Sequence, residues 1–480
     1  MKTKTNRPIQ YDAAVIGSGP NGLAAAITMA REGYSVKVFE ASDTVGGGTR
    51  TKELTLPGFS HDICSAIHPM AAASPFLKSL PLEDYGLKWI HPTYPLAHPL
   101  DDEPPAMLYQ SFSETVDALG DDGSAYQKLF EPIVNNWDSL AEQLLGPLSL
   151  LPNTPLLLAR FGLKALQPAE RLALTSFSSE RGKALFAGLA AHSILPLDTI
   201  STSAIGMVLG AVGHVEGWPF PEGGSHAITQ AMARYLELLG GEIECETEIE
   251  SLDQLPDSKV VFFNNTPKQI LNIAGEKIPN NYAKKLRNFE YGAGVFKIDL
   301  ALDGPIPWSD EECKKAGTVH LGGTLEEIKD SEDCLKNNTH TEKPYVLVAQ
   351  QSLFDESRAP EGKHTCWAYC HVPHGSTKDM TEPILNQIER FAPGFRDLII
   401  GRHAMNTQAM ESYNSNYIGG DINGGKQDIS QLFTRPAGLF NPYHIPGTNM
   451  YISSSSTPPG GGVHGMCGYH AAQAALKEFE

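Results

Sequence analysis

The chain has 480 residues, of which 41% are hydrophobic and 19% are charged, so it is neither disordered nor a coiled coil and is long enough for two to four domains. Its net charge of -19 argues against a nucleic-acid partner and against anchoring on anionic lipid by a basic face. The seven cysteines are scattered without a CxxC pair, which excludes a zinc ribbon or a dithiol redox motif, and we expect no metal site. The polar first ten residues are not followed by the apolar h-region of a secretory signal, and no run reaches the roughly 18 apolar residues of a membrane span. We therefore expect a reduced, cytoplasmic protein.

The first 40 residues predict a strand, a glycine-rich turn, a helix and a second strand. The turn carries Gly17, Gly19 and Gly22, with Pro20 between them, directly after the apolar strand at 11–16. In a dinucleotide-binding unit the first glycine makes the turn, the second lets the backbone approach the pyrophosphate, and the third lets helix and strand pack closely. The helix N-terminus then faces the phosphates.

Glu40 ends the second strand, at residues 34–39. A carboxylate at this place accepts hydrogen bonds from a ribose diol and repels a 2′-phosphate. Together with the turn it predicts dinucleotide binding rather than an ordinary glycine-rich turn in an α/β sheet.

A second glycine-rich loop, at 46–51, follows Glu40. It would bring bare backbone and the cation of Arg50 against another part of a long ligand. FAD needs such a contact and nicotinamide dinucleotides usually do not, so the loop favours FAD. A flexible surface loop with a solvated arginine is the alternative.

The middle of the chain is predicted in chain order from its apolar pattern. Residues 57–110 look irregular, and 112–192 look helical. Within them the leucine-rich stretch 144–166 could be buried in the core, line a lipophilic tunnel or make a peripheral membrane contact. Further predictions are a buried segment at 204–213, a helix at 225–239, strands at 242–249 and 260–263, and strand-like runs with one helix near 380–392 between 290 and 430.

Strand segments at both ends of the chain predict a discontinuous nucleotide domain. The fold class is α/β, with a Rossmann-like FAD-binding domain and a mixed α+β substrate domain. We assign residues 1–70, 218–280 and 440–480 to the FAD-binding domain. Residues 71–217 and 281–439 form the substrate domain.

The C-terminal segment contains three consecutive glycines, at 460–462, shortly before an alanine-rich helix. Bare backbone there would allow close approach of a flat ring system. The helix N-terminus would point at the flavin N1/C2=O edge and stabilise the negative charge of the reduced ring. A plain turn before a terminal helix is the alternative.

The motifs GSGPNGLAAA, VFEA and VGGGTRT near the start and SSTPPGGGVHGMCGYHAA at the end resemble those of the phytoene desaturase-like FAD-dependent oxidoreductases. The chain is similar to the branch of pyridine nucleotide-disulphide oxidoreductase domain-containing proteins, within the flavin amine oxidase-like superfamily. The resemblance implies the following FAD contacts: pyrophosphate at Gly17, Gly19, Pro20 and Gly22; adenosine ribose at Glu40; phosphates and ribityl chain at Ala41, Gly47, Gly48, Thr49 and Arg50; adenine at Ile249; flavin at Gly461, Gly462, Val463 and Met466.

Two positions depart from the family pattern. Gly48 stands where many relatives have arginine, and Ser454 where many have glycine. Both indicate a distinct subfamily and weaken a transfer of carotenoid substrates.

Three histidines are candidates for acid or base chemistry. His464 lies in the C-terminal glycine loop, His68 follows the second loop, and His214 borders the central apolar segment with His192 and Trp218. Each has a structural alternative: His464 can hold its loop, His68 can be a loop hydrogen-bonder, and the others can be core residues.

The sequence therefore predicts an FAD-dependent oxidoreductase, dehydrogenase- or desaturase-like. It would transfer a hydride from a C–H bond of a lipophilic small molecule to flavin N5, and would be reoxidised by oxygen, a quinone or another acceptor. Alternatives are a flavin amine oxidase, a redox-neutral flavin isomerase and a non-catalytic flavin-bound protein.

Overall fold

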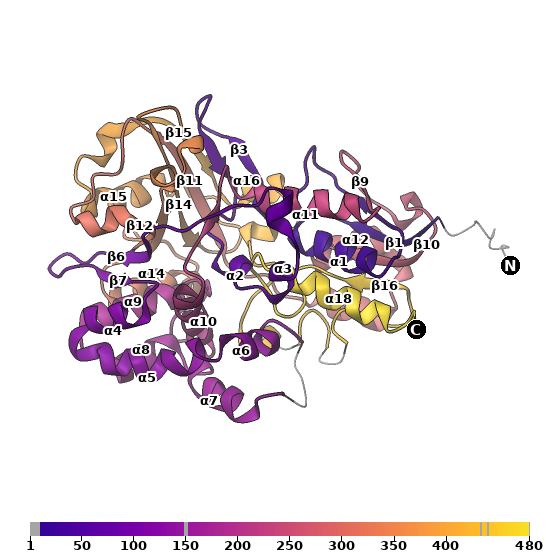
Figure 1. Ribbon diagram of the computed structural model, residues 1–480, viewed down its shortest axis with the longest axis horizontal. Helices are drawn as coiled ribbons and strands as arrows, with labels where there is room; N and C mark the ends of the chain where they lie inside the picture. Colours follow the sequence, from indigo (N-terminus) through magenta and orange to yellow (C-terminus); the bar gives the residue numbers. More distant parts are fainter. Residues whose placement is uncertain (1–9, 148–151, 433, 439–440, 480) are drawn as a thin grey trace.

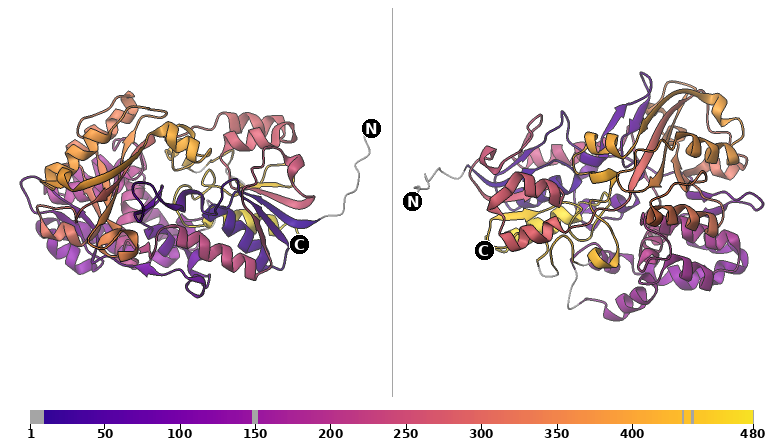
Figure 2. Two further views of the ribbon diagram at one scale, coloured as in Figure 1. Left: turned by 90° about the horizontal axis from the view of Figure 1, so that it is seen from above. Right: turned by 180° about the vertical axis from the view of Figure 1, so that it is seen from behind.

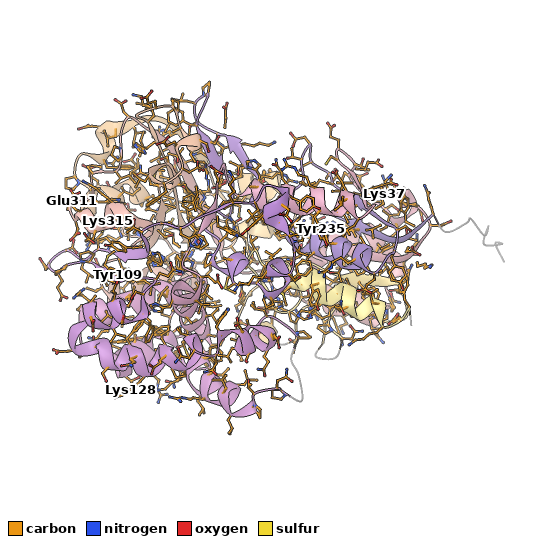
Figure 3. The ribbon with its side chains drawn as sticks, viewed as in Figure 1. Lys37, Tyr109, Lys128, Tyr235, Glu311 and Lys315 are labelled. Atoms are coloured by element: carbon orange, nitrogen blue, oxygen red, sulfur yellow. The ribbon has the colours of Figure 1, made fainter. Side chains whose placement is uncertain are left out.

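The structure is a computed structural model that describes residues 10–147, 152–432, 434–438 and 441–479. Two sheets lie toward opposite ends of an elongated molecule, and a group of helices lies beside the larger sheet (Figure 1). The side-chain view shows the separation: Lys37 lies at the end that holds the smaller sheet, whereas Tyr109 and Lys315 lie at the other end (Figure 3).

The smaller sheet is parallel and is buried on both faces. Ala13 and Val15 of its central strand pack into one core with α1 and α18, while Ala14 and Ile16 pack into another with α12 and α13, which is why this strand shows no polar alternation. The strand order is β16 (Met450–Ile452), β10 (Ser258–Phe263), β1 (Tyr11–Ile16), β2 (Val36–Phe39) and β9 (Glu242–Glu244). The covering helices are α1 (Pro20–Arg31), α11 (His226–Leu238) and α18 (Met466–Leu476) on one face, and α12 (Pro267–Ala274) and α13 (Asn280–Arg287) on the other. The predicted Rossmann-like arrangement is confirmed.

The larger sheet is mixed and offers one face to the interior of the molecule. Its pairs are antiparallel except for β12 with β6. Phe296 and Ile298 of its long strand β11 belong to the outer core with α15, whereas Val295 and Lys297 point to the inner face. The order is β15 (Ile399–Met405), β11 (Gly294–Leu302), β14 (His364–Val372), β13 (Val346–Ala349), β12 (Ala316–Leu321), β6 (Tyr94–His98) and β7 (Ala106–Leu108); α15 spans Thr381–Phe391.

A group of helices covers the inner side of the larger sheet, as both views of Figure 2 show. Helix α10 (Thr202–Val215) is central in this group and packs against α5, α7, α8 and α9, which confirms the predicted buried segment at 204–213. The other members are α4 (Phe112–Ala118), α5 (Gly123–Val134), α6 (Trp137–Leu144), α7 (Pro155–Ala165), α8 (Ala169–Ser176), α9 (Glu180–Ala191) and α14 (Leu325–Asn337). The remaining α-helices are short: α2 (Pro69–Ala72), α3 (Pro75–Lys78), α16 (Thr407–Tyr413) and α17 (Ile429–Leu432). The remaining strands form two ribbons, β3 (Thr51–Glu53) with β4 (Ser60–Asp62) and β5 (Trp89–Ile90) with β8 (Phe220–Pro221).

The predicted strand at 242–249 is wrong beyond Glu244. Glu246 has a φ of 55°, which ends extended pairing. Its N–H donates to the carbonyl of Ser42, and the N–H of Thr247 donates to that of Glu40. The segment therefore leaves the sheet and crosses the tip of β2.

Two other predictions need correction. The region 57–110 is less irregular than expected, because it supplies β6 and β7 to the larger sheet. The interpretation of 144–166 as buried core fails on α7, where Leu156 and Leu163 are 86% and 74% exposed; residues 148–151 of that stretch lie outside the described chain.

The two-domain boundaries stay a prediction. Among the described residues, no helix is both long and apolar enough to cross a membrane.

Helices α1 and α18 cross at a glycine. A Cβ atom at Gly468 would lie 1.7 Å from the carbonyl oxygen of Asn21, which no rotamer change relieves. We expect Gly468→Ala to lower the free energy of unfolding by about 1–3 kcal/mol, measured by urea titration. The control is Gly162→Ala in α7, where a Cβ meets nothing within 4 Å. This substitution should raise the free energy of unfolding by about 0.5–1 kcal/mol. Equal stability of Gly468→Ala and the wild type would contradict this packing.

Candidate functional site

A cavity of about 740 Å³ lies between the carboxyl ends of the parallel strands and the inner face of the larger sheet. Gly17, Glu40 and Ile249 line one end, and Trp218 and Leu347 line the other. Ligands of open α/β sheets bind at this edge, outside the carboxyl ends of the strands. The cavity thus joins the predicted dinucleotide site to the larger sheet.

The first glycine loop has the shape that its sequence predicts. Gly17 has a φ of 95°, which a residue with a side chain rarely adopts. A Cβ at Gly22 would lie 2.0 Å from the carbonyl of Gly17, so α1 packs tightly on the turn. Gly19 precedes the helix and provides no side-chain cap. The N–H groups of the first turn are therefore open to a ligand or to a neighbouring side chain.

Asn264 is that neighbouring side chain, and the sequence analysis missed it. It follows β10, the strand beside β1. Its carboxamide satisfies both of its polar atoms in the orientation in which Oδ1 accepts hydrogen bonds from the N–H groups of Gly19 and Gly22, at 3.1 and 3.2 Å. Its position at the carboxyl end of an adjacent parallel strand was the available signal.

Glu40 is buried and makes four hydrogen bonds within the chain. It accepts from the N–H and Oγ of Ser18, at 2.9 and 2.6 Å, from the N–H of Ser42 at 3.0 Å, and from Arg50 at 2.9 Å. These donors fill the lone-pair positions of the carboxylate. Arg50 also binds the carbonyls of Thr44 and Gly47, so it fastens the second glycine loop to Glu40 rather than standing free for a phosphate.

The second loop packs against residues that the sequence analysis did not connect with it. A Cβ at Gly48 would lie 2.5 Å from the hydroxyl of Tyr417, so the tyrosine leaves no room for a side chain at this position. Thr49 is buried, with its hydroxyl 3.1 Å from that of Thr229, and does not line the cavity. A Cβ at Gly47 would approach Gly19 to 3.0 Å, so the two loops touch.

The C-terminal loop reaches the cavity through Gly462 and Val463. Gly461 instead faces Asn423 and Gln427, whose side chains lie 2.7 and 2.8 Å from its Cβ position. Helix α18 begins directly afterwards, at Met466, which is buried outside the cavity.

The candidate histidines have different surroundings, and only His68 lines the cavity. His464 accepts the N–H of Met466 on Nδ1 at 3.0 Å, so it caps α18 and holds the loop. His214 binds the hydroxyl of Tyr126 at 2.7 Å and the carbonyl of Gln110 at 3.3 Å. Both side chains are bonded within the chain, and neither lines the cavity.

His68 is neutral at neutral pH. Its Nε2 lies 2.7 Å from the Oγ of Ser225, which donates to the carbonyl of Ser65, so Nε2–H is the donor. Burial lowers the pKa of His68 to about 4.

Charged and aromatic side chains on β11 and β14 also line the cavity, and the sequence analysis missed them. Lys297 forms a buried ion pair with Asp299, two residues along the same face of β11. Burial raises the pKa of Asp299, but the charge of Lys297 and further contacts hold it below its ordinary value. Trp367 and Tyr369 of β14 complete this wall. The signal was a lysine and an aspartate at i and i+2 in an otherwise apolar strand.

The cavity brings together most of the predicted site. The residues that line it are Gly17, Gly19, Pro20, Glu40, Ala41, Gly47, Gly48, Arg50, His68, Ile249, Gly462 and Val463; those that do not are Gly22, Thr49, His214, Gly461, His464 and Met466. No group of three or more acidic, histidine or cysteine residues among those described could hold a metal ion.

Comparisons with known proteins agree with this geometry. Residues 15–80 match the NAD(P)-binding Rossmann-like domain. Pyridine nucleotide-disulfide oxidoreductase domain-containing protein 2 of Rattus norvegicus is 26% identical, over 98% of this chain and 94% of its own length. A 4,4'-diapophytoene desaturase of Methylomonas sp is 21% identical, over 96% and 94%.

The chain is homologous to these oxidoreductase-domain proteins and desaturases. Its fold is also that of putrescine oxidase, with a TM-score of 0.60 and 17% identity over 98% of this chain and 99% of the other. The coarse class of the chain is therefore FAD-type oxidoreductase.

Asn264 offers a test of the loop geometry. A carboxylate at this position would lie against the pyrophosphate and repel it. We expect Asn264→Asp to bind FAD at least about tenfold more weakly than Asn264→Ala, which frees the same N–H groups without adding charge. Titration of the deflavinated proteins with FAD measures both constants. Equal affinities would show that the pyrophosphate does not lie beside Asn264.

Proposed function

We propose that this protein is an FAD-dependent dehydrogenase or desaturase-like enzyme that removes hydride from a C–H bond of a lipophilic small molecule. The observation that carries the proposal is the continuous cavity, which joins Glu40 and the glycine loop to Val463 and Lys297. We call its inner end, lined by Trp218 and Leu347, the chamber.

The residues present fit FAD. The cavity volume lies within the roughly 300–1,000 Å³ of sites for large ligands. A Cβ at Gly19 or Gly47 would enter the space where the two loops meet, so bare backbone is kept where a pyrophosphate would lie. The first turn of α1 has no side-chain cap of its own and matches an anion.

Each end of the cavity has a separate task. The loop Gly17–Gly22 would bind the pyrophosphate, and Glu40 with the backbone of Ile249 would bind the adenosine. Because the carboxylate of Glu40 already has four donors, a ribose hydroxyl would replace one of them, and the N–H of Ser42 is the weakest of the four bonds by length. Gly462 and Val463 would border the ring.

When bound, FAD supplies the two-electron acceptor, at its N5 atom. Lys297 holds a proton at Nζ beside the cavity, and Asp299 balances its charge. His68 is neutral and keeps a lone pair on Nδ1, which has no partner among the described residues. The substrate is oriented by the inner walls of the cavity, which exclude water from the reacting C–H bond.

The inner part of the cavity supports a lipophilic substrate. Apolar and aromatic side chains line it, from α2, α10, β11, β13, β14 and the loops next to α2, α9 and α10; they are Ile67, Met70, Ile194, Leu209, Trp218, Val295, Leu347, Trp367 and Tyr369. Such a lining binds an apolar molecule through the hydrophobic effect.

Helix α7 supports a peripheral membrane contact. Leu156 and Leu163 are exposed two turns apart, with the cation Arg160 between them on the same face. The helix projects at the edge of the molecule (Figure 1) and packs on α10, which lines the chamber. A lipophilic substrate could pass from the bilayer to the cavity along this route.

The purified protein should be yellow, and acid precipitation should release FAD. Gly19→Ala should raise the dissociation constant of FAD at least about tenfold, a loss of about 1.4 kcal/mol, because a methyl group enters the pyrophosphate path. The fold tolerates it, since only the flexible end of Asn264 has to move.

Gly304→Ala, in a loop outside the cavity with 3.8 Å of clearance, is the matched control. Anaerobic photoreduction followed by oxygen or a quinone then identifies the electron acceptor. A well-folded protein that neither contains nor takes up FAD would overturn the proposed function.

A further inference from the structure

The inner end of the cavity holds two polar groups that the chain does not satisfy. Thr318, on β12, is 3% exposed and lines the cavity, and its Oγ1 has no partner among the described residues. His192, after α9, lines the same end, and its Nδ1 makes no hydrogen bond there and is not enclosed by the protein. Buried polar groups normally have partners, so the hydroxyl of Thr318 indicates where a ligand's polar atom lies, and His192 presents its Nδ1 at the same end of the cavity.

His192 is held in place by a second histidine. Its Nε2 lies 3.0 Å from the Nε2 of His320, which is fully buried. His320 and Thr318 are two residues apart on β12, so both point to the same face of the sheet, about 7 Å apart along the strand. His192 and Thr318 are therefore both positioned by regular elements, His192 by the end of α9 and Thr318 by β12.

The two histidines are uncharged. Burial lowers the pKa of His192 to about 3, with a smaller effect of His371. Burial and the neighbouring His192 and His98 hold the pKa of His320 well below its ordinary value. The pair can offer one N–H or one lone pair to a ligand, but it does not offer charge.

The charge of the chamber disfavours a cationic ligand. Among the described lining residues, the carboxylates are Glu40, Glu248 and Glu250, which lie at the dinucleotide end, and the chamber itself contributes the cation Lys297. The partner of Lys297 is Asp299, which lies two residues along the same face of β11 and does not line the cavity. An ammonium group would enter an apolar space beside another cation without a free carboxylate.

We propose that the chamber binds an uncharged lipophilic molecule that carries a hydroxyl or carbonyl oxygen, and that Thr318 and His192 hydrogen-bond to this oxygen. The inference rests on the proposed function, because it names the substrate class of the same site. Thr318 donates its hydroxyl proton to the oxygen, and His192 supplies the second bond. Oxygen-free hydrocarbons would leave both groups unpaired, and amines would meet Lys297.

The test is equilibrium binding to the purified flavoprotein of four probes that share one chain: 1-octanol, 2-octanone, n-octane and octylammonium. Trp218 and Trp367 line the chamber, so tryptophan fluorescence reports occupancy without turnover. We expect octylammonium to bind at least about tenfold more weakly than 1-octanol.

The decisive comparison uses Thr318→Val, which keeps the side-chain shape. Because the hydroxyl has no partner in the free protein, the thermal midpoint should stay unchanged or rise. The dissociation constants of 1-octanol and 2-octanone should rise about three- to tenfold, while that of n-octane should stay the same or fall. His192→Phe should act in the same direction.

Thr365→Val is the matched control. Thr365, on β14, is equally buried and its hydroxyl also has no partner, but it lies outside the cavity lining, so this variant should bind all four probes like the wild type. Unchanged binding of the oxygen probes to Thr318→Val and His192→Phe, or preferred binding of octylammonium, would overturn the inference. If FAD binds as proposed but the probes do not show the expected differences, only the substrate class is wrong. If FAD does not bind, the proposed function itself is wrong.

Discussion

Two contacts that tolerate no side chain, at Gly22 and Gly468, position the helices beside the cavity. Gly22 lets α1 lie on the turn after β1, and Gly468 lets α18 lie on the start of α1. Because of the second contact, a segment from the end of the chain is fixed against a segment from its beginning. Gly462 and Val463, which directly precede α18, are thereby brought to the cavity that starts at Gly17. The rest of the site depends on this crossing.

The cavity separates charge from apolar surface along its length. The glycine loops, Glu40 and Arg50 form a polar end, where backbone N–H groups and a carboxylate match a dinucleotide. Toward the larger sheet, the histidines that line the cavity are neutral, because burial lowers the pKa of His68 to about 4 and that of His192 to about 3. Lys297, paired with Asp299, lines the cavity from the inner face of the larger sheet. This division supports a polar cofactor and an uncharged substrate in one cavity.

The sequence predicted the dinucleotide end well, because its signals are local. Gly17, Gly19 and Gly22 have the spacing of the dinucleotide-binding fingerprint and lie between a strand and a helix, as that fingerprint requires. The chamber could not be predicted in the same way. Thr318 and His192 are far apart in the chain and line the same end of the cavity only because α9 packs on the larger sheet.

Departures from the sequence-based expectations have identifiable physical causes. His464 is a candidate because of its place in the C-terminal glycine loop, but its Nδ1 accepts the N–H of Met466 and its side chain does not line the cavity. The strand expected at 242–249 ended early because alternation in sequence does not report the positive φ of Glu246. Lys297 was overlooked, although an aspartate two residues further along an otherwise apolar strand was a signal for a buried ion pair.

The central claim is that a single cavity holds FAD between the two ends of the chain. A crystal structure of the protein purified with its own flavin tests it most directly. The account predicts density for FAD along the cavity, with the adenosine beside Glu40 and Ile249, the pyrophosphate at Gly17–Gly22 and the ring beside Val463. A pyrophosphate away from the glycine loop, or a ring that does not reach Val463, would contradict it.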